Sequence, residues 1–251
     1  MGPTVGANLP EVNLSLGEAL KPQLAGLQQR FAADAEVIAL PLETSYRFQC
    51  RVHGTDIPVI FDTLVGLYHV PPVPLTKQPV IVDLGANIGC TMVHFATLYP
   101  NARIVGVELD AENVRLARIN TAAIPDHATL FHSAIWPHDG TVAYSGDEAW
   151  GYHVASTGDR PVEALSMLSL IARAELSTID FLKVDIEGGE RELFEGELPW
   201  LAAVNAIAIE VHNDKPFIHR LVALLRRHGF QAMRDTRHWS AVIGARIGRA
   251  L

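Results

Sequence analysis

Features that mark secreted, membrane-spanning or nucleic-acid-binding proteins are scarce in this chain. Its 251 residues include 2 cysteines, too few for a disulfide framework. No apolar run approaches the roughly 18 residues of a membrane span, and the first 20 residues lack the basic stretch of a signal peptide. The net charge of −8 disfavours binding to the phosphate backbone of nucleic acids and to anionic membranes. We therefore expect a cytoplasmic protein with no nucleic-acid or membrane partner.

The composition is that of a globular protein, with 49% hydrophobic and 19% charged residues, and its character changes near residue 75. Residues 71–79 hold four prolines and cannot form the interior of a helix. We divide the chain into an N-terminal cap or lid segment (1–75) and a main domain (76–251). Within the cap, apolar spacing predicts a helix over 15–35. Two strands are predicted over 45–53 and 56–61, with Asp62 as the cap of a short helix after them.

Strand and helix patterns alternate after residue 79. The expected strands are 80–84, 103–107, 129–135, 181–184, 206–209, 230–234 and 239–243. The expected helices are 88–99, 111–120 (with Asp110 as N-cap) and 216–228. This order predicts an α/β domain with a mostly parallel seven-stranded sheet and helices on both faces. Residues 140–160 break the pattern and predict a hairpin or loop lying over the sheet.

The clearest local signal is a buried strand that runs into a glycine turn and then a helix, over residues 80–90 (VIVDLGANIGC). Gly85 and Gly89 permit a tight turn and let a ligand approach the bare backbone. Glu108 ends the next strand, 19 residues after Gly89, where a carboxylate can accept both hydroxyls of a ribose. Dinucleotides and S-adenosylmethionine both use such a layout.

The residues within the turn favour S-adenosylmethionine. A dinucleotide site needs G-x-G-x-x-G, but the three positions are Gly85, Asn87 and Ile88. Asp83 would repel a pyrophosphate, whereas it suits the α-ammonium group of S-adenosylmethionine. The pattern D-x-G-x-N-x-G resembles the first motif of class I methyltransferases, so an NAD-dependent oxidoreductase is disfavoured.

A second motif identifies a family. Residues 179–190 (IDFLKVDIEGGE) closely resemble the signature of FkbM-type methyltransferases, and further landmarks fall in register at 132–135 (HSAI) and 207–212 (IAIEVH). The resemblance covers about residues 56–213. It implies a Rossmann-like class I methyltransferase fold, S-adenosylmethionine as donor, and O-methylation, often of sugars or sugar-bearing natural products. The expected cofactor-binding residues are Asp83, Gly85, Ala86, Asn87, Gly89, Glu108, Leu109, Ser133, Ala134 and Asp185, with Ser133, Ala134 and Ile135 at the adenine edge.

An acceptor hydroxyl needs a general base or a metal ion, because its pKa lies far above 7. Asp185 and Glu210 each follow a strand, and the carboxyl ends of these strands should converge. With Glu187 they are candidate ligands of Mg²⁺. The catalytic candidates are Asp185 and two possible general bases, His212 and His153.

Other interpretations stay open at this point. One alternative is that the acidic residues of the site bind no metal and instead form hydrogen bonds and orient loops. Trp150 and Tyr152, next to His153, can face a sugar ring or pack the hairpin. The alternatives to metal-assisted methylation of a small-molecule or oligosaccharide acceptor are a metal-free enzyme acting on a non-sugar compound and a protein that binds the cofactor without turnover. A homodimer is left open.

Overall fold

The computed structural model describes residues 37–41, 47–51, 55–122, 124, 128–145, 153–155, 160–212 and 214–246. The helix predicted over 15–35, and the side chains of Trp150, Tyr152 and His153, lie outside this description. Within the described residues, no helix is both long enough and apolar enough to cross a membrane.

The main sheet has seven strands, as the sequence predicts. Their order is β12 (Gln231–Arg234), β13 (Ala241–Ala245), β11 (Val204–Glu210), β10 (Ile179–Val184), β3 (Val80–Leu84), β4 (Arg103–Glu108) and β5 (Ala128–His132). Neighbouring strands from β11 to β5 are parallel, while β13 runs antiparallel to β11 and β12. The carboxyl ends of β3, β4, β10 and β11 therefore meet at one edge.

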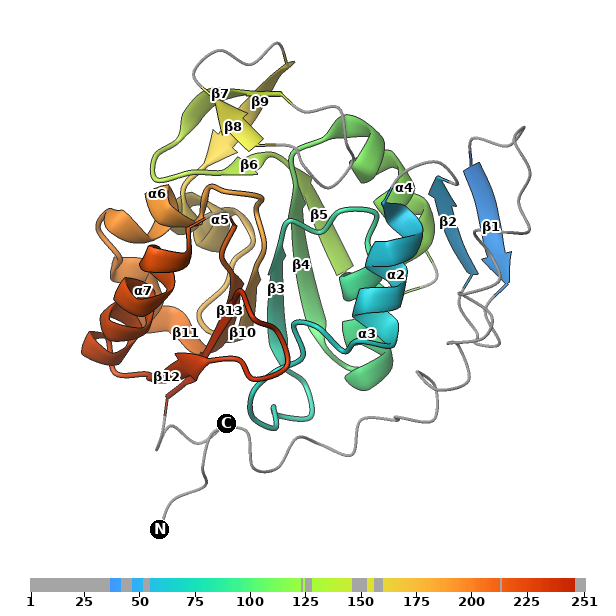
Figure 1. The fold of residues 1–251 in the computed structure, drawn as a ribbon. Coiled ribbons are helices and arrows are strands. Elements are labelled where there is room, and N and C mark those ends of the chain that lie inside the picture. The colour runs from blue at the N-terminus through green and yellow to red at the C-terminus, as the bar shows by residue number, and fades with distance from the viewer. Residues whose placement is uncertain are drawn as a thin grey trace.

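Helices cover both faces of this sheet, which confirms the α/β prediction (Figure 1). On one side lie α5 (Met167–Arg173), α6 (Glu190–Glu195) and α7 (Lys215–Arg227), and on the other α3 (Cys90–Leu98) and α4 (Ala111–Thr121). Successive strand residues alternate between the two cores: Val82 and Leu84 join one, whereas Ile81 joins the other. This period of two is why β3 reads as a continuous apolar run.

Two helix ends have the capping residues that the sequence predicts. The Asp110 side chain accepts hydrogen bonds from the backbone N–H groups of Glu112 and Asn113, as predicted. Helix α7 ends just before Gly229, whose φ of +87° suits glycine. The short helices α5 and α6, and the 3₁₀-helix η1 (Pro199–Ala203), were not predicted.

Residues 140–145 and 153–155 pair antiparallel as the predicted hairpin, and they belong to a second, four-stranded sheet. It has the order β6 (Ala134–Ile135), β9 (Arg160–Leu165), β7 (Gly140–Ser145) and β8 (His153–Ala155). The single strand predicted over 129–135 is divided at Ser133, because β5 pairs with β4 as far as His132 and β6 then pairs with β9. This turn brings residues 133–135 to the carboxyl edge of the main sheet.

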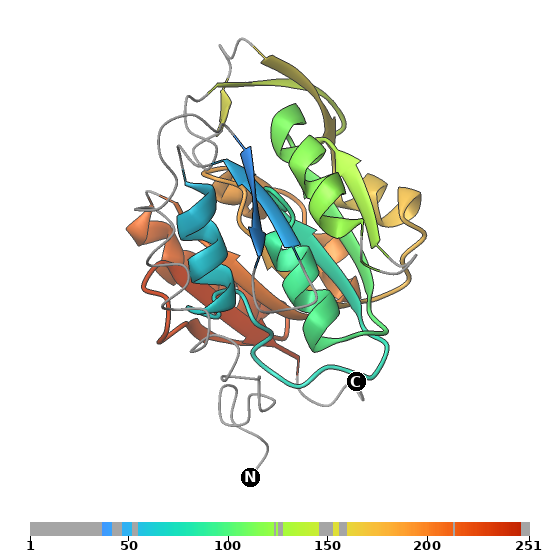
Figure 2. The ribbon, with the colours of Figure 1, turned by 90° about the vertical axis from the view of Figure 1, so that its right-hand side faces the viewer.

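The N-terminal part adds a third layer outside α3 and α4 (Figure 2). Strands β1 (Val37–Pro41) and β2 (Arg47–Arg51) pair antiparallel, and α2 (Asp56–Leu64) follows. The strand predicted over 56–61 is wrong: these residues form α2, and Asp62 lies in its last turn rather than at its start. Buried residues recur at helical spacing because α2 packs on α3, and the shared core includes Phe48, Ile57, Ile60, Ile88 and Leu116. The domain boundary near residue 75 stays a prediction.

Candidate active site

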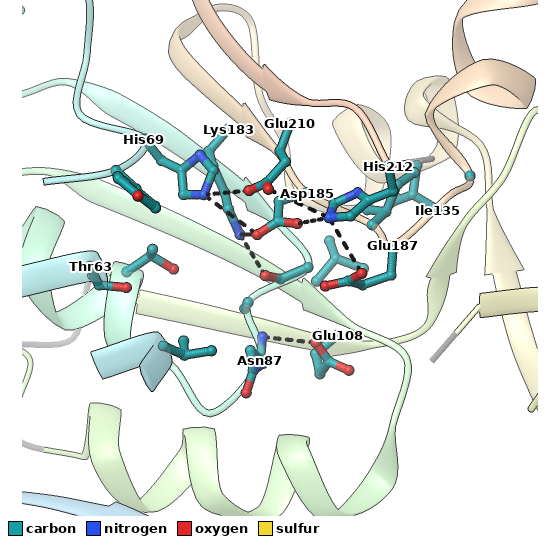
Figure 3. A pocket seen from close by; sticks show the side chains of 18 of the residues that line it. Thr63, His69, Asn87, Glu108, Ile135, Lys183, Asp185, Glu187, Glu210 and His212 are labelled. Carbon is teal, nitrogen blue, oxygen red and sulfur yellow. Dashed lines mark hydrogen bonds and ion pairs between the residues drawn. The ribbon is translucent and has the colours of Figure 1, made fainter. Parts of the chain in front are cut away.

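A cavity of about 540 Å³ opens at the carboxyl edge of the main sheet. Its walls come from the glycine turn after β3, the ends of β4, β10 and β11, and residues 133–135 and 238–240. The C-terminal part of α2 and the segment after it close one side (Figure 3). Eight of the ten predicted cofactor residues line this cavity: Gly85, Ala86, Asn87, Glu108, Leu109, Ser133, Ala134 and Asp185.

The glycine turn is held between two neighbouring strands. The N–H groups of Gly85 and Ala86 both donate to the carbonyl of Val107, at 2.9 Å each. Gly85 has a φ of +76°, and a β-carbon there would lie 1.7 Å from the carbonyl oxygen of Asp185. Only glycine fits, so the glycine turn and Asp185 are in direct backbone contact.

Gly89 and Asp83 are the two predicted cofactor residues that do not line the cavity. Gly89 faces α4 instead, since a β-carbon there would lie 3.2 Å from the Cα of Ala117. Asp83 is completely buried, pairs with Lys183 at 3.0 Å and accepts a hydrogen bond from the Thr91 hydroxyl. The expectation that Asp83 faces the ligand is corrected, because its side chain is fully buried against these partners and does not line the cavity.

Glu108 and Ser133 are polar residues of the cavity wall beside the glycine turn. The Glu108 carboxylate accepts from the N–H groups of Asn87 (2.8 Å) and Asp110 (2.9 Å). Burial raises the pKa of Glu108 above its usual value, against these hydrogen bonds. The Ser133 hydroxyl is buried and has no hydrogen-bond partner among the described residues. A carboxylate at the end of β4 and an unpaired hydroxyl beside it fit a nucleoside ligand.

The predicted metal-binding carboxylates, Asp185, Glu187 and Glu210, converge on the opposite half of the cavity, which we call the acidic half. Asp185 and Glu210 lie 3.6 and 3.7 Å from Nε2 of His212, and Glu187 lies 3.4 Å from the same atom (Figure 3). Possible ligand atoms of Asp185, Glu187 and His212 all lie within 4.8 Å of one another, as do those of His69, Asp185 and Glu210. The candidate metal residues are therefore brought together, in two groups that share Asp185.

His212 is fixed by carboxylates on both ring nitrogens. Its Nδ1 lies 3.1 Å from Oε1 of the buried Glu190, whose carboxylate also accepts from the N–H of Gly188. Burial would lower the pKa of His212, but the hydrogen bond to Glu190 and the nearby carboxylates raise it to about 10. A pKa that high favours the charged ring near pH 7, whereas a general base must be neutral. The base role of His212 stays a prediction. Burial and the charge of Asp185 raise the pKa of Glu187 to about 8.

Lys183 is a buried cation that the sequence analysis did not single out. Its side chain is 2% exposed, and its Nζ contacts Asp83 (3.0 Å), Asp185 (3.3 Å) and the carbonyl of Gly85 (2.6 Å). Burial would lower the pKa of Lys183, but the two carboxylates hold it well above its usual value. Burial would raise the pKa of Asp185, but Lys183 and the two histidines hold it at about 2. Lys183 therefore joins the glycine turn to the acidic half.

The sequence analysis also missed His69, His238 and Trp239, which line this side of the cavity. Nε2 of His69 lies 3.3 Å from Glu210 and 3.6 Å from Asp185. Trp239 lines the cavity and is 65% exposed. No sequence motif connects these positions to residues 179–212. The candidate base His153 lies in β8, where its backbone pairs with Ser145, and only its backbone is described.

Comparison with known proteins places this geometry in a wider context. The model of the methyltransferase FkbM domain family matches residues 83–232. The chain is 26% identical over 201 residues to 31-O-demethyl-FK506 methyltransferase FkbM of Streptomyces tacrolimicus, covering 65% of this chain and 76% of that protein. It is also 26% identical over 139 residues to hexuronic acid methyltransferase AglP of Haloferax volcanii, covering 54% of this chain and 57% of the relative.

Among solved structures, the fold resembles that of methyltransferase FkbM from Methylobacillus flagellatus, with a TM-score of 0.50 and 15% identity. The match covers 90% of this chain and 58% of the longer protein. At that identity the likeness concerns the fold alone.

Proposed function

The chain belongs to the FkbM methyltransferase family, and on that premise we propose that it transfers a methyl group from S-adenosylmethionine to a hydroxyl of a sugar, glycoside or polysaccharide, assisted by a divalent metal ion. The observation that carries this proposal is the division of one cavity into two halves. The glycine turn, Glu108 and Ser133 form the first half, and Asp185 with its neighbouring carboxylates forms the second. The two halves touch where Gly85 meets Asp185.

The first half fits the cofactor. When bound, S-adenosylmethionine supplies an electrophilic methyl group on a positively charged sulfur. Glu108 would accept hydrogen bonds from the ribose hydroxyls, and Ser133, Ala134 and Ile135 would contact the adenine. The negatively charged carboxylates of the second half would stabilise the positive charge on the sulfur of the bound cofactor. These roles, and a cytoplasmic location, are part of the proposal.

The second half fits an acceptor alcohol and a cation. An alkyl hydroxyl is almost wholly protonated near pH 7, so the growing charge on its oxygen must be stabilised. Asp185, Glu210 and Glu187 offer oxygen ligands, and a divalent ion held there would lower the pKa of the acceptor hydroxyl. His212, held by Glu190, keeps the neighbouring carboxylates in place.

The names of the relatives support transfer to oxygen and a sugar acceptor. The Haloferax relative is named for hexuronic acid, which supports a sugar. The Streptomyces relative is named for 31-O-demethyl-FK506, which supports transfer to oxygen. The alternative acceptor is a non-sugar compound, methylated without metal. A third alternative is a protein that binds the cofactor without turnover; it predicts cofactor binding with no transfer to any acceptor.

Transfer of labelled methyl to a panel of methyl glycosides and uronic acids tests the proposal. We expect activity to disappear in EDTA and to return with Mg²⁺ or Mn²⁺. Asp185→Ala and Glu210→Ala should lower turnover roughly 100-fold, as the loss of a charge-stabilising group does. Full activity in EDTA would end the metal part and leave the base roles of His212 and His153 to be compared by His212→Ala and His153→Ala.

Calorimetry with S-adenosylhomocysteine and NAD tests the cofactor separately. We expect binding of S-adenosylhomocysteine and not of NAD. Glu108→Ala should weaken it roughly 10- to 100-fold, in line with the ~1–3 kcal/mol of an unpaired polar group. Glu112→Ala, an exposed acid on α4, is the matched control. Unchanged affinity in Glu108→Ala would remove Glu108 from the site.

A further inference from the structure

His69 reaches the acidic half of the cavity from outside the main sheet. It follows α2 in the N-terminal part, and Figure 3 shows its ring pointing at Glu210 and Asp185. Its side chain is 8% exposed, and its φ of +63° lies in the left-handed region that residues with a β-carbon rarely adopt. The fold holds this imidazole against two carboxylates despite that strain.

Negative charge is concentrated around His69. The carboxylates in or beside the acidic half include Asp62, Asp83, Asp185, Glu187, Glu190 and Glu210. Lys183 pairs with two of them, Asp83 and Asp185, and histidine rings supply further contacts. In addition, Oδ1 of Asp185 is buried, has no hydrogen-bond partner among the described residues, and lies 3.6 Å from Nε2 of His212. Such an excess of carboxylate oxygens, one of them unsatisfied, is stabilised by a bound cation.

The two histidines beside Asp185 differ in the contacts of their ring nitrogens. Nδ1 of His212 lies 3.1 Å from the Glu190 carboxylate, and its Nε2 lies 3.4 to 3.7 Å from Glu187, Asp185 and Glu210, so both nitrogens already have carboxylate neighbours. His69 approaches Asp185 and Glu210 through Nε2. That nitrogen faces the same space as the two carboxylates, and it is the atom that the ring can offer as a ligand.

We propose that His69, Asp185 and Glu210 together bind one divalent first-row transition-metal ion, an inference that rests on the proposed metal-assisted function. Their possible ligand atoms lie within 4.8 Å of one another. One nitrogen and two carboxylate ligands disfavour Mg²⁺, which takes oxygen ligands, relative to Mn²⁺ and the later metals. The metal expected from the sequence, Mg²⁺, is thus replaced in this inference by a softer ion.

The ligand set also gives the ion a mechanical role. Asp185 and Glu210 belong to the sheet, whereas His69 belongs to the N-terminal part. A bound ion therefore links the segment after α2 to the ends of β10 and β11. Because the ion binds the folded chain, it should raise the melting temperature and slow proteolysis within residues 65–79.

Binding of Mn²⁺ alone to the EDTA-treated full chain tests this inference. Electron paramagnetic resonance of free Mn²⁺ should show one ion bound per chain, with Mg²⁺ competing at least 10-fold more weakly. His69→Phe keeps an aromatic ring but has no nitrogen, and should lower the affinity for Mn²⁺ at least 10-fold and abolish the thermal shift. His219→Phe, at an exposed position on α7, is the matched control.

A second measurement uses the unmodified chain, so that a variant that fails to fold leaves the inference testable. Electron spin-echo modulation of bound Mn²⁺ should show a directly coordinated nitrogen. Absence of that signal, binding unchanged in His69→Phe, or loss of binding in His212→Phe but not in His69→Phe would overturn the inference. Failure of S-adenosylhomocysteine to bind would instead overturn the proposed function.

Discussion

At the scale of single residues, polar side chains that pair with one another inside the protein are withdrawn from the cavity. Asp83 shows this most clearly: its sequence position suggested a ligand contact, yet Lys183 and Thr91 hold it inside the protein. A strand pattern predicts where a carboxylate lies along the chain. It does not predict which buried cation will neutralise it, because Lys183 arrives from another strand 100 residues later.

His94 provides a residue-scale prediction about pH and stability. It is buried in α3, its Nδ1 has no hydrogen-bond partner among the described residues, and burial lowers its pKa from 6.5 to about 4. The unfolded chain therefore binds the proton more readily between pH 6.5 and 4, so acidification through this window destabilises the fold. The cost is on the order of 3 kcal/mol by pH 4.

His94→Leu should remove this contribution. We expect its urea midpoint to fall less between pH 7 and pH 5 than that of the unmodified chain. His219→Leu, at an exposed position, should leave the pH dependence unchanged. Equal losses for His94→Leu and the unmodified chain would show that other groups account for the acid sensitivity.

At the scale of elements, the turns after the strands decide the site. The glycine turn after β3 and the turn between β12 and β13 both line the cavity, and they act differently. The first is a fixed backbone feature closed by Asp185, and the second presents an exposed aromatic ring. Each gives a separate prediction.

Gly85→Ala should destabilise the fold and weaken cofactor binding together. A β-carbon would collide with the carbonyl of Asp185, and the positive φ alone costs about 1–2 kcal/mol for a residue other than glycine. Thermal melting and calorimetry with S-adenosylhomocysteine would measure both effects. Gly196→Ala is the control, since a β-carbon there meets no atom within 4 Å. Equal behaviour of the two variants would contradict the described turn.

Trp239→Ala should raise the KM for a sugar acceptor and leave cofactor affinity unchanged. The indole is 65% exposed at the cavity, and Lys215 Nζ lies 5.0 Å from its ring, so a flat face remains available to a sugar. Losing it should raise KM roughly 3- to 10-fold, in line with the ~0.5–1.5 kcal/mol of an aromatic contact. Leu168→Ala, 53% exposed on α5, is the control. An unchanged KM would leave Trp239 without an acceptor role.

The elements also show what the sequence could predict. Buried parallel strands such as β3 and β10 are recognisable from short apolar runs, and their carboxyl ends correctly located Asp185 and Glu210. Helix α2 was misread because Ile57, Val59 and Ile60 favour strands when considered locally. Its packing against α3 decides the outcome, and that contact is not visible in the local pattern. His69 and Trp239 were missed for the same reason, since tertiary structure alone brings them to the cavity.

At the scale of the whole molecule, the N-terminal part is more than a cover. It shares a core with α3 and α4 and supplies Asp62, Thr63, Tyr68 and His69 to the cavity wall. The predicted division near residue 75 therefore has a direct test in a shortened chain of residues 76–251.

The shortened chain should be less stable and should lose Mn²⁺ binding. Removal of the N-terminal part exposes Ile88, Val93 and Leu116, and buried apolar side chains each contribute roughly 1.5–3 kcal/mol. Solubility, thermal melting and Mn²⁺ titration against the full chain would measure the loss. A fragment that matches the full chain in all three would make residues 76–251 an independent domain.

The contact between Tyr68 and His238, whose ring centroids lie 4.2 Å apart, has a consequence for folding during translation. One wall of the cavity is translated early, whereas the hairpin of β12 and β13 that carries its counterpart is translated late. The cavity is thus incomplete while the ribosome is still making most of the chain. Ligand binding at the complete cavity cannot stabilise the nascent chain until that hairpin has joined the sheet. The N-terminal layers that are synthesised first must therefore be stabilised by their own packing.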